Sequence, residues 1–208
     1  MKKPLQLFFL TLLSCVWTVQ SYAIFVPQSD PAEMVRVLST ELIKAMNEQR
    51  PELESSPEKV KAFAAIYVLP YIDTYKMARY VMGKHWRTAT ESQQSEFMEA
   101  FSNTLIRSYS RSLLKLNIES VKVVNAQQEQ PGRVTVPSVV IQSDGNQTDV
   151  IYRAYLNKES QKWMLYDVSI EGISMLLNYR KAYDSDFSRI GIDAVIVDMK
   201  AKNSAFNG

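Results

Sequence analysis

The sequence predicts an α+β fold in which a curved four-stranded antiparallel sheet packs against helices, with a further helical extension. The spacing of apolar residues along the chain predicts this fold class. Apolar residues recur at helical spacing from about residue 31 to 116, alternate with polar residues from about 121 to 170, and return to helical spacing after Gly172. A period near 3.6 is typical of amphipathic helices, and a period of two is typical of half-buried strands. Helices and strands that are grouped separately along the chain favour the α+β class.

The first two helices begin at capping signals that contain proline. Residues 30–33 combine an N-cap aspartate, a proline at the first helical position and a capping-box glutamate, which predicts a helix to about residue 49. Residues 56–58 repeat the signal. The helix that starts there should end before Pro70, because proline cannot donate the backbone hydrogen bond that a helix interior needs.

Two more helices are expected before the sheet. The third should start at Pro70 and stop at Gly83, because glycine is the usual residue just beyond a helix C-terminus. Residues 90–93 form a capping box and open the fourth helix. An apolar or aromatic residue recurs at every fourth position from Phe97 to Leu113, which makes this the clearest helix of the sequence.

The middle of the chain predicts four strands and short turns. Val121 and Val123 alternate with polar residues, and alternation returns over residues 134–141, 150–156 and 163–170. The pair Asp144-Gly145 is a strong hairpin signal. Short strands joined by short turns predict an antiparallel meander.

The tail and the length complete the domain organisation. Helical spacing covers about residues 172–183 and returns over 192–199. Residues 24–208, about 185 in number, are predicted to form a single domain, which is long enough to bury a hydrophobic core.

Residues 1–23 are predicted to be a secretory signal peptide that is cleaved after Ala23. Two lysines precede an apolar run, residues 5–13, that is too short to span a bilayer, and a small-residue exit site follows at residues 21–23. Cys15 leaves open a lipoprotein signal, in which that cysteine would be acylated. No later stretch approaches the ~20 apolar residues of a membrane span, so we expect an exported protein that does not span a membrane.

Charge gives no sign of a nucleic-acid partner. The whole chain has 24 basic and 22 acidic residues. Cleavage of the predicted leader would remove Lys2 and Lys3 and no acidic residue, which leaves 22 of each. A neutral mature chain lacks the basic footprint of a nucleic-acid binder.

Few side chains suggest catalysis. His85 is the only histidine, and the sequence has neither a metal-ligand motif nor a nucleophile elbow, so we predict no enzyme, no catalytic residue, no metal site and no cofactor. Asp167 could act as a general base if it lay in an apolar pocket. Strand alternation favours instead that Asp167 points away from the side that carries Met164 and Val168. Asp149 and Arg153, four apart on one strand, are expected to be solvated.

Soft apolar side chains are abundant. The chain has nine Met, eleven Tyr and eight Phe. Such residues build ordinary cores, but they also line adaptable apolar pockets well.

Several segments, in this order and spacing, resemble motifs of the MlaC family, also called the toluene-tolerance or Ttg2 family. They are a P-x-x-D-x-x-x-M-A segment at residues 70–78, G-K-H-W-R-T-A-T at 83–90, Y-D-V at 166–168 with E-G-I-S-M at 171–175, Y-R at 179–180 and G-I-D-A-V-I at 191–196. Each motif is modest alone, but the resemblance extends from about residue 30 to residue 203.

The resemblance implies an NTF2-like or cystatin-like cone with extra helices that holds phospholipid tails between sheet and helices. It implies a periplasmic carrier that moves lipid between an outer-membrane lipoprotein–porin complex and an inner-membrane ABC transporter with an MCE-domain protein. This transport would maintain the lipid asymmetry of the outer membrane. Bound phospholipid is then cargo rather than a cofactor.

If tails are buried and the polar head group stays at the mouth, apolar residues on both layers should contact the tails. On the helices we predict Met77, Tyr80, Val81, Phe97, Phe101, Leu105 and Tyr109. On the sheet and beyond it we predict Val139, Ile141, Ile151, Tyr155, Tyr166, Val168, Ile173 and Leu177. Ordinary core packing explains each of them equally well. For docking to partners, the candidates are Lys84, Arg87, Arg107, Arg111 and Arg180, which could equally form a solvated face.

Two other functions stay open. An NTF2-like enzyme acting on an apolar substrate would use Asp167 or His85, and requires a partly buried ionisable group in its pocket. A periplasmic chaperone would present an exposed apolar groove rather than a closed cavity.

Overall fold

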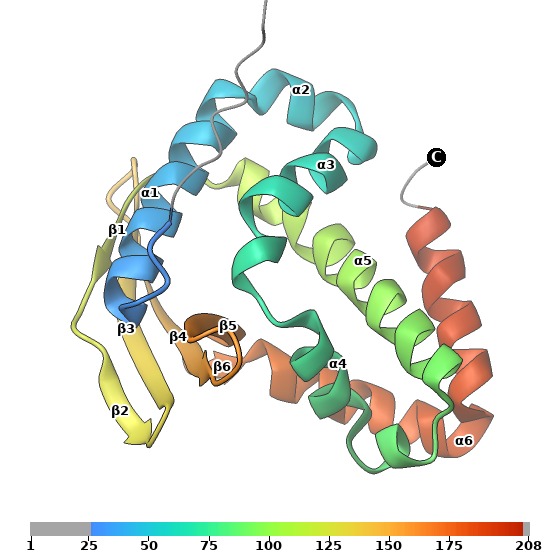
Figure 1. Ribbon diagram of the computed structural model, residues 1–208. Helices are drawn as coiled ribbons and strands as arrows, with labels where there is room; N and C mark the ends of the chain where they lie inside the picture. The colour runs from blue at the N-terminus through green and yellow to red at the C-terminus, as the bar shows by residue number, and fades with distance from the viewer. Residues whose placement is uncertain (1–25, 206–208) are drawn as a thin grey trace, which may run out of the picture.

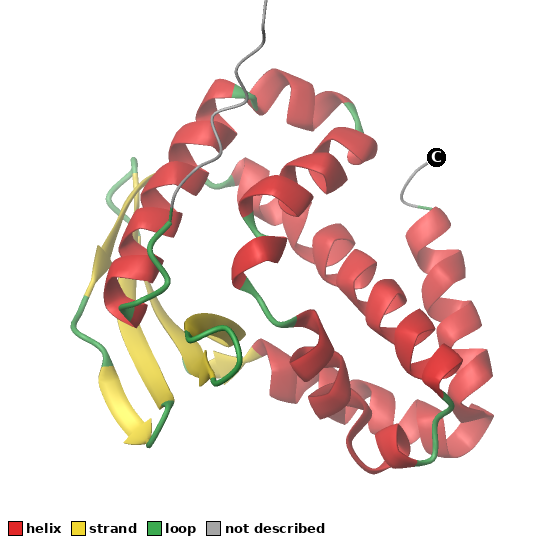
Figure 2. Cartoon of the chain, viewed as in Figure 1, coloured by secondary structure: helices red, strands yellow, loops and turns green. Residues whose placement is uncertain are grey.

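The computed structural model describes residues 26–205, so the predicted leader, residues 1–23, lies outside the described residues. A strongly curved sheet forms one side of the molecule and a group of helices forms the other (Figures 1 and 2). The predicted α+β class, with a curved antiparallel sheet packed by helices, is confirmed.

The sheet has six strands, two more than the sequence predicts. Its order is β1-β3-β4-β5-β6, with β2 also paired to β3, and all named pairs are antiparallel. The extra strands are β2, which is polar and exposed and so has no alternation, and β6, which is only two residues long. The strands are β1 (Ile118–Val123), β2 (Gln127–Gln130), β3 (Arg133–Gln142), β4 (Gln147–Asn157), β5 (Lys162–Ile170) and β6 (Ile173–Ser174).

Helix α1 (Pro31–Glu48) covers one face of the sheet (Figure 1). The Asp30 carboxylate accepts the Glu33 backbone N–H at 2.7 Å, as the capping signal predicts. Met34 and Val35 of α1 are buried against sheet residues, which are Val134, Val136, Ala154 and Leu165. We call this the α1 face.

Strand β5 contains a bulge at Tyr166. Ala154 pairs with Leu165 and Arg153 pairs with Asp167, so Tyr166 is an extra residue on its strand. Beyond the bulge the alternation is shifted. Asp167 therefore shares the face opposite α1 with Arg153, and Val168 lies beside Tyr152 on the α1 face.

The bulge makes one prediction wrong. Strict alternation placed Asp167 on the opposite side of β5 from Met164. Met164 pairs with Tyr155, however, and by register both lie on the face that also carries Asp167 and Arg153.

The helices lie close to the predicted ranges, with three differences, one of which is that α6 continues past the predicted end at about residue 183 to a break at Gly191. They are α2 (Arg50–Ser55), α3 (Pro57–Tyr67), the 3₁₀ turn η1 (Leu69–Tyr71), α4 (Thr74–Met82), the 3₁₀ segment η2 (Gly83–Arg87), α5 (Glu91–Lys115) and α6 (Met175–Ser204). The short helix α2 was not predicted. Helix α4 starts at Thr74 rather than Pro70, because the Asp73 side chain caps it by accepting the Lys76 N–H at 2.8 Å.

Helix α6 is broken at Gly191, whose φ of 82° and ψ of 168° are not helical. The segment after Gly191 lies along α5 (Figure 1). The buried Asn203 amide fixes it there, because it donates to the Ala100 carbonyl at 2.9 Å and accepts from the Thr104 hydroxyl at 3.2 Å. None of the helices within residues 26–205 is long and apolar enough to cross a membrane.

Candidate lipid-binding site

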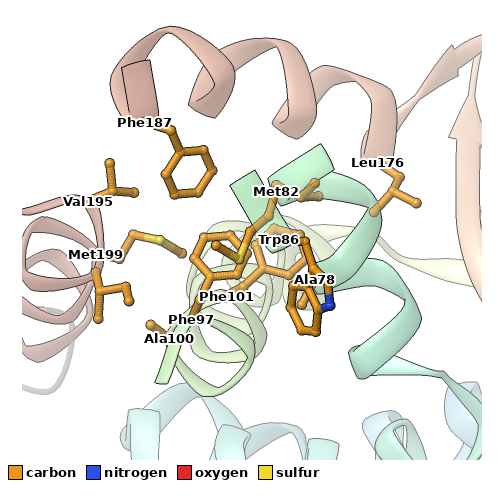
Figure 3. Close-up of a cluster of buried hydrophobic side chains, with 12 residues drawn as sticks. Ala78, Met82, Trp86, Phe97, Ala100, Phe101, Leu176, Phe187, Val195 and Met199 are labelled. Carbon is orange, nitrogen blue, oxygen red and sulfur yellow. The ribbon is translucent and has the colours of Figure 1, made fainter. Parts of the chain in front are cut away.

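Side chains from α4, η2, α5 and α6 converge in one apolar cluster, which we call the helical cluster (Figure 3). At its centre the rings of Phe97 and Phe101 stack with centroids 5.8 Å apart, and neither ring is more than 1% exposed. The other buried members are Ala78, Val81, Met82, Trp86, Ala100, Leu176, Phe187, Val195, Ile196 and Met199. Two methionines beside two aromatic rings make this interior adaptable in shape.

A row of aromatic residues on α6 lines the same cluster. Tyr179, Tyr183 and Phe187 are four residues apart, and their rings contact α5. The Tyr179 ring meets the Phe101 ring edge-on at 5.2 Å and the Tyr109 ring at 6.4 Å. Burial raises the pKa of Tyr109, and it raises the pKa of Tyr183 to about 12. The sequence prediction missed Tyr179 and Tyr183, although their four-residue spacing was available as a signal.

The second apolar surface is the sheet face opposite α1. By register it carries Val139, Ile141, Ile151 and Tyr155, all of them half-buried. Helices α4 and α6 reach the sheet mainly at β5, so β3 and β4 are covered less closely on this side than on the α1 face. Tyr166 connects the two surfaces, because its ring lies 6.1 Å from that of Tyr155 and it also packs against the helical cluster.

A polar network anchors the start of α6 to this face. Asp167 is 6% exposed, and its Oδ2 lies 3.1 Å from Arg153 Nη1 and 2.6 Å from Ser174 Oγ. Its Oδ1 accepts the backbone N–H groups of Val168 and Leu176 at 2.9 and 3.0 Å. Asp149 is exposed, as expected, whereas Arg153 is half-buried, because the bulge brings Asp167 opposite it.

Charged groups gather where α4 meets β4. Lys76 Nζ lies 3.5 Å from the centre of the Tyr155 ring, a cation–π arrangement. The Tyr155 hydroxyl donates to the Asp73 carboxylate. Burial, together with the bond to Asp73, raises the pKa of Tyr155 to about 12. Loss of hydration lowers the pKa of Lys76, and the nearby Asp73 carboxylate opposes that shift.

The structure brings most of the predicted contact residues together in two groups. Those in or against the helical cluster are Met77, Val81, Phe97, Phe101, Leu105 and Tyr166, and Tyr109 joins them through Tyr179. Those on the sheet face opposite α1 are Val139, Ile141, Ile151 and Tyr155.

Four predicted residues lie elsewhere. Val168 shares the α1 face with Tyr152. Tyr80, Ile173 and Leu177 are 40%, 66% and 41% exposed.

The helical cluster is filled by the protein's own side chains. Two surface hollows lie beside it, and charged or polar side chains contribute to the walls of both. One, of about 430 Å³, lies between η2 and α6, and the other, of about 330 Å³, lies between α5 and the end of α6. Within residues 26–205, no group of three or more His, Cys, Asp or Glu side chains is arranged to hold a metal ion.

His85 lies at the edge of the cluster. Its ring is 5.1 Å from the Phe187 ring, and its Nε2 is 3.4 Å from the Asp184 carboxylate. This position agrees with a packing role.

Comparisons with known proteins agree with this architecture. The intermembrane phospholipid transport system binding protein MlaC of Haemophilus influenzae is 18% identical to the chain over 181 residues, which cover 86% of this chain and 85% of that protein. A phospholipid-binding protein from Ralstonia solanacearum, solved in complex with a phospholipid, has the same fold. Its TM-score is 0.77 at 21% identity, and the match covers 86% of this chain and 99% of that one.

The family model described as MlaC protein matches residues 36–201, which is most of the chain and includes both apolar surfaces. The chain therefore belongs to the MlaC family.

Proposed function

We propose that this protein is a phospholipid carrier of the periplasm, which holds acyl tails between the helical cluster and the sheet face opposite α1. One observation carries the proposal: two facing layers present soft apolar side chains, and one of them is only half-covered. The phospholipid bound to the structural relative from Ralstonia solanacearum supports this choice of ligand.

The energetics suit a carrier. Burial of a methylene stabilises by ~0.8 kcal/mol, so roughly thirty methylenes of a diacyl lipid would contribute about 24 kcal/mol in total. Because non-covalent affinities level off near 18 to 21 kcal/mol, part of this gain must offset the cost of ordering the tails and opening the protein. A bilayer offers the tails a similar environment, so exchange with a membrane is near balance while release into water is not.

Entry of the tails requires movement. Because the helical cluster is closely packed, α4, α5 and α6 must shift or their side chains must repack to admit a hydrocarbon chain. Met77 and Met82 make repacking easier, since methionine adapts to irregular spaces at low cost. Breaks in helical geometry at Gly83 and Gly191 supply points at which the helices can reorient.

A carrier role fits the polar groups better than catalysis does. Both carboxylate oxygens of Asp167 already accept two hydrogen bonds each, so no lone pair is left well placed for a substrate proton. We therefore assign Asp167 a structural role.

Transport between the two membranes follows from the same proposal. The relative from Haemophilus influenzae is named for intermembrane phospholipid transport. We infer that this chain likewise receives lipid from one membrane complex and delivers it to another, an outer-membrane lipoprotein–porin complex and an inner-membrane ABC transporter with an MCE-domain protein. This exchange would maintain outer-membrane lipid asymmetry.

Lipid content tests the proposal. The full chain is exported, purified without detergent and measured by native mass spectrometry, with organic extraction as a check. We expect near-stoichiometric phospholipid. Leu105→Asp, on the helical cluster, should lose most of the lipid per folded protein, whereas Leu42→Asp, in a separate cluster of α1, α2 and α3, should keep it.

The opposite results are equally clear. A lipid-free protein that cannot be loaded from vesicles would refute the carrier function. Equal lipid in the two variants would remove the helical cluster from the site.

A further inference from the structure

The hollow of about 430 Å³ between η2 and α6 has an unusual set of walls. Lys84, Arg180 and Lys181 contribute positive charge, Asp184 contributes one negative charge, and Leu177 supplies an apolar wall. It is an open hollow at the surface, since all five of its lining residues are exposed. It also adjoins the helical cluster, since Leu176, Tyr179 and Tyr183, which precede its wall residues Leu177, Arg180 and Asp184 in α6, lie in or against that cluster.

The exposed Arg180 side chain packs beside Tyr80 and Gly83 at this hollow. Its guanidinium lies 4.9 Å from the centre of the Tyr80 ring. It also lies against Gly83, where a Cβ atom would come within 3.1 Å of Arg180 Nη2. Gly83 has a φ of +54°, which favours glycine as well. A planar guanidinium presents several N–H donors to an anion with several oxygens.

The positive charges are mostly unpaired. Lys84 Nζ lies 3.8 Å from Asp184, and both side chains are more than half exposed, so this ion pair is weak. Asp184 also faces His85 at 3.4 Å. Among the residues that the structure describes, no carboxylate lies within ion-pair distance of Arg180 or Lys181.

We propose that this hollow binds the phosphate group of a phospholipid, with Arg180 and Lys181 as its main donors and Lys84 as a third. Guanidinium and ammonium groups form charge-assisted hydrogen bonds with phosphate oxygens. Leu177, 41% exposed, would contact the glycerol and the first methylenes beside the phosphate. The inference rests on the proposed function for the source of the phosphate, and it places the head group at the surface above the helical cluster.

Soluble probes test the anion site without lipid. Delipidated full-length protein is titrated with glycerol 3-phosphate and, separately, with glycerol, and binding is followed by NMR. We expect the phosphate ester to bind and glycerol not to bind. The double variant R180Q/K181Q should weaken the binding of glycerol 3-phosphate by about tenfold or more. The matched control K158Q/K162Q removes two exposed lysines at the β4–β5 turn. It should leave the affinity for glycerol 3-phosphate unchanged. Equal affinity in both double variants would overturn the proposal.

Vesicle loading separates a lipid head group from free phosphate. Wild-type and variant proteins are loaded from vesicles that contain phosphatidylglycerol or, instead, diacylglycerol, which lacks the phosphate. R180Q/K181Q should lower the loading of phosphatidylglycerol severalfold and leave diacylglycerol unchanged. Normal loading of phosphatidylglycerol in a variant that no longer binds glycerol 3-phosphate would overturn the head-group assignment.

The two proposals fail in different ways. Wild-type protein that takes up neither lipid, yet binds glycerol 3-phosphate through Arg180 and Lys181, would refute the carrier function and the lipid source while leaving an anion site. Uptake of both lipids with no effect of R180Q/K181Q in either assay would refute the phosphate site alone.

Discussion

Arg153 and Asp167 form an ion pair between β4 and β5, with 3.1 Å between Nη1 and Oδ2, on the sheet face opposite α1. The Asp167 side chain is 6% exposed and that of Arg153 is 29% exposed. Ser174, the N-cap of α6, donates to the same carboxylate at 2.6 Å. The pair therefore joins two strands to α6, which carries five of the twelve buried residues of the helical cluster.

Asp167→Ala should destabilise the protein strongly. Loss of the carboxylate leaves the buried Leu176 N–H without its acceptor and removes one partner of Arg153, which keeps Ser169 and Glu129, at a cost of ~1–3 kcal/mol. Urea denaturation followed by circular dichroism measures the change. The exposed pair of Arg189 and Asp186 supplies the control, since Asp186→Ala should cost less than about 1 kcal/mol. Equal losses in the two variants would contradict a structural role for Asp167.

The sequence predicted the long strands and most helices because capping residues and apolar periodicity are local signals. The capping box at Thr90 and Gln93 is present as predicted, with both hydrogen bonds formed. Proline misled the prediction at residue 70, because Pro70 lies in a 3₁₀ turn and the Asp73 carboxylate starts α4. Local spacing does not show whether a helix starts at this proline or after the aspartate three residues later.

The site was harder to predict than the fold. A bulge adds one residue to a strand without any change in its apolar pattern. Alternation alone therefore could not show on which face of the sheet Asp167 and Val168 lie. The pairing of Tyr109 with Tyr179 joins helices that are far apart in sequence. Such contacts depend on how α5 and α6 cross, which spacing within each helix does not determine.

The bulge supplies a sharp test of the lipid-facing surface. Ile151 and Val168 are both half-buried sheet residues, but by register they lie on opposite faces. Ile151→Gln should reduce bound phospholipid per folded protein severalfold, whereas Val168→Gln should lower stability and leave lipid content unchanged. Native mass spectrometry measures both. Lipid loss in Val168→Gln alone would place the tails on the α1 face instead.

Stability should fall in strongly alkaline solution. The pKa of Tyr183 is raised to about 12 by burial, and that of Tyr155 to about 12 by burial and its bond to Asp73. An unfolded chain ionises its tyrosines near pH 10, so between about pH 10 and 12 it binds fewer protons than the native state. The free energy of unfolding therefore decreases as pH rises through this window and is unaffected by these groups below it.

Tyr183→Phe keeps the ring and removes the ionisable group. Urea denaturation at several pH values should show a smaller loss of stability between about pH 10 and 12 than in the unmodified protein. An equally steep loss would mean that the burial of Tyr183 does not contribute to the alkaline transition.

The break in α6 should require glycine at position 191. Its φ of 82° and ψ of 168° lie in a region that is essentially restricted to glycine. A Cβ atom at this position would meet no atom within 4 Å, so Gly191→Ala adds backbone strain but no clash. We expect a loss of ~1–3 kcal/mol in the free energy of unfolding. Ser188→Ala, exposed on the same helix, should stay within about 0.5 kcal/mol.

A second outcome would be equally informative about the break in α6. If alanine straightened the helix instead, Val195, Ile196 and Met199 would leave the helical cluster, since all three lie beyond Gly191. The variant would then bind an environment-sensitive hydrophobic dye and lose lipid as well as stability. A Gly191→Ala protein as stable as the unmodified chain, with normal lipid content, would show that the break does not depend on glycine.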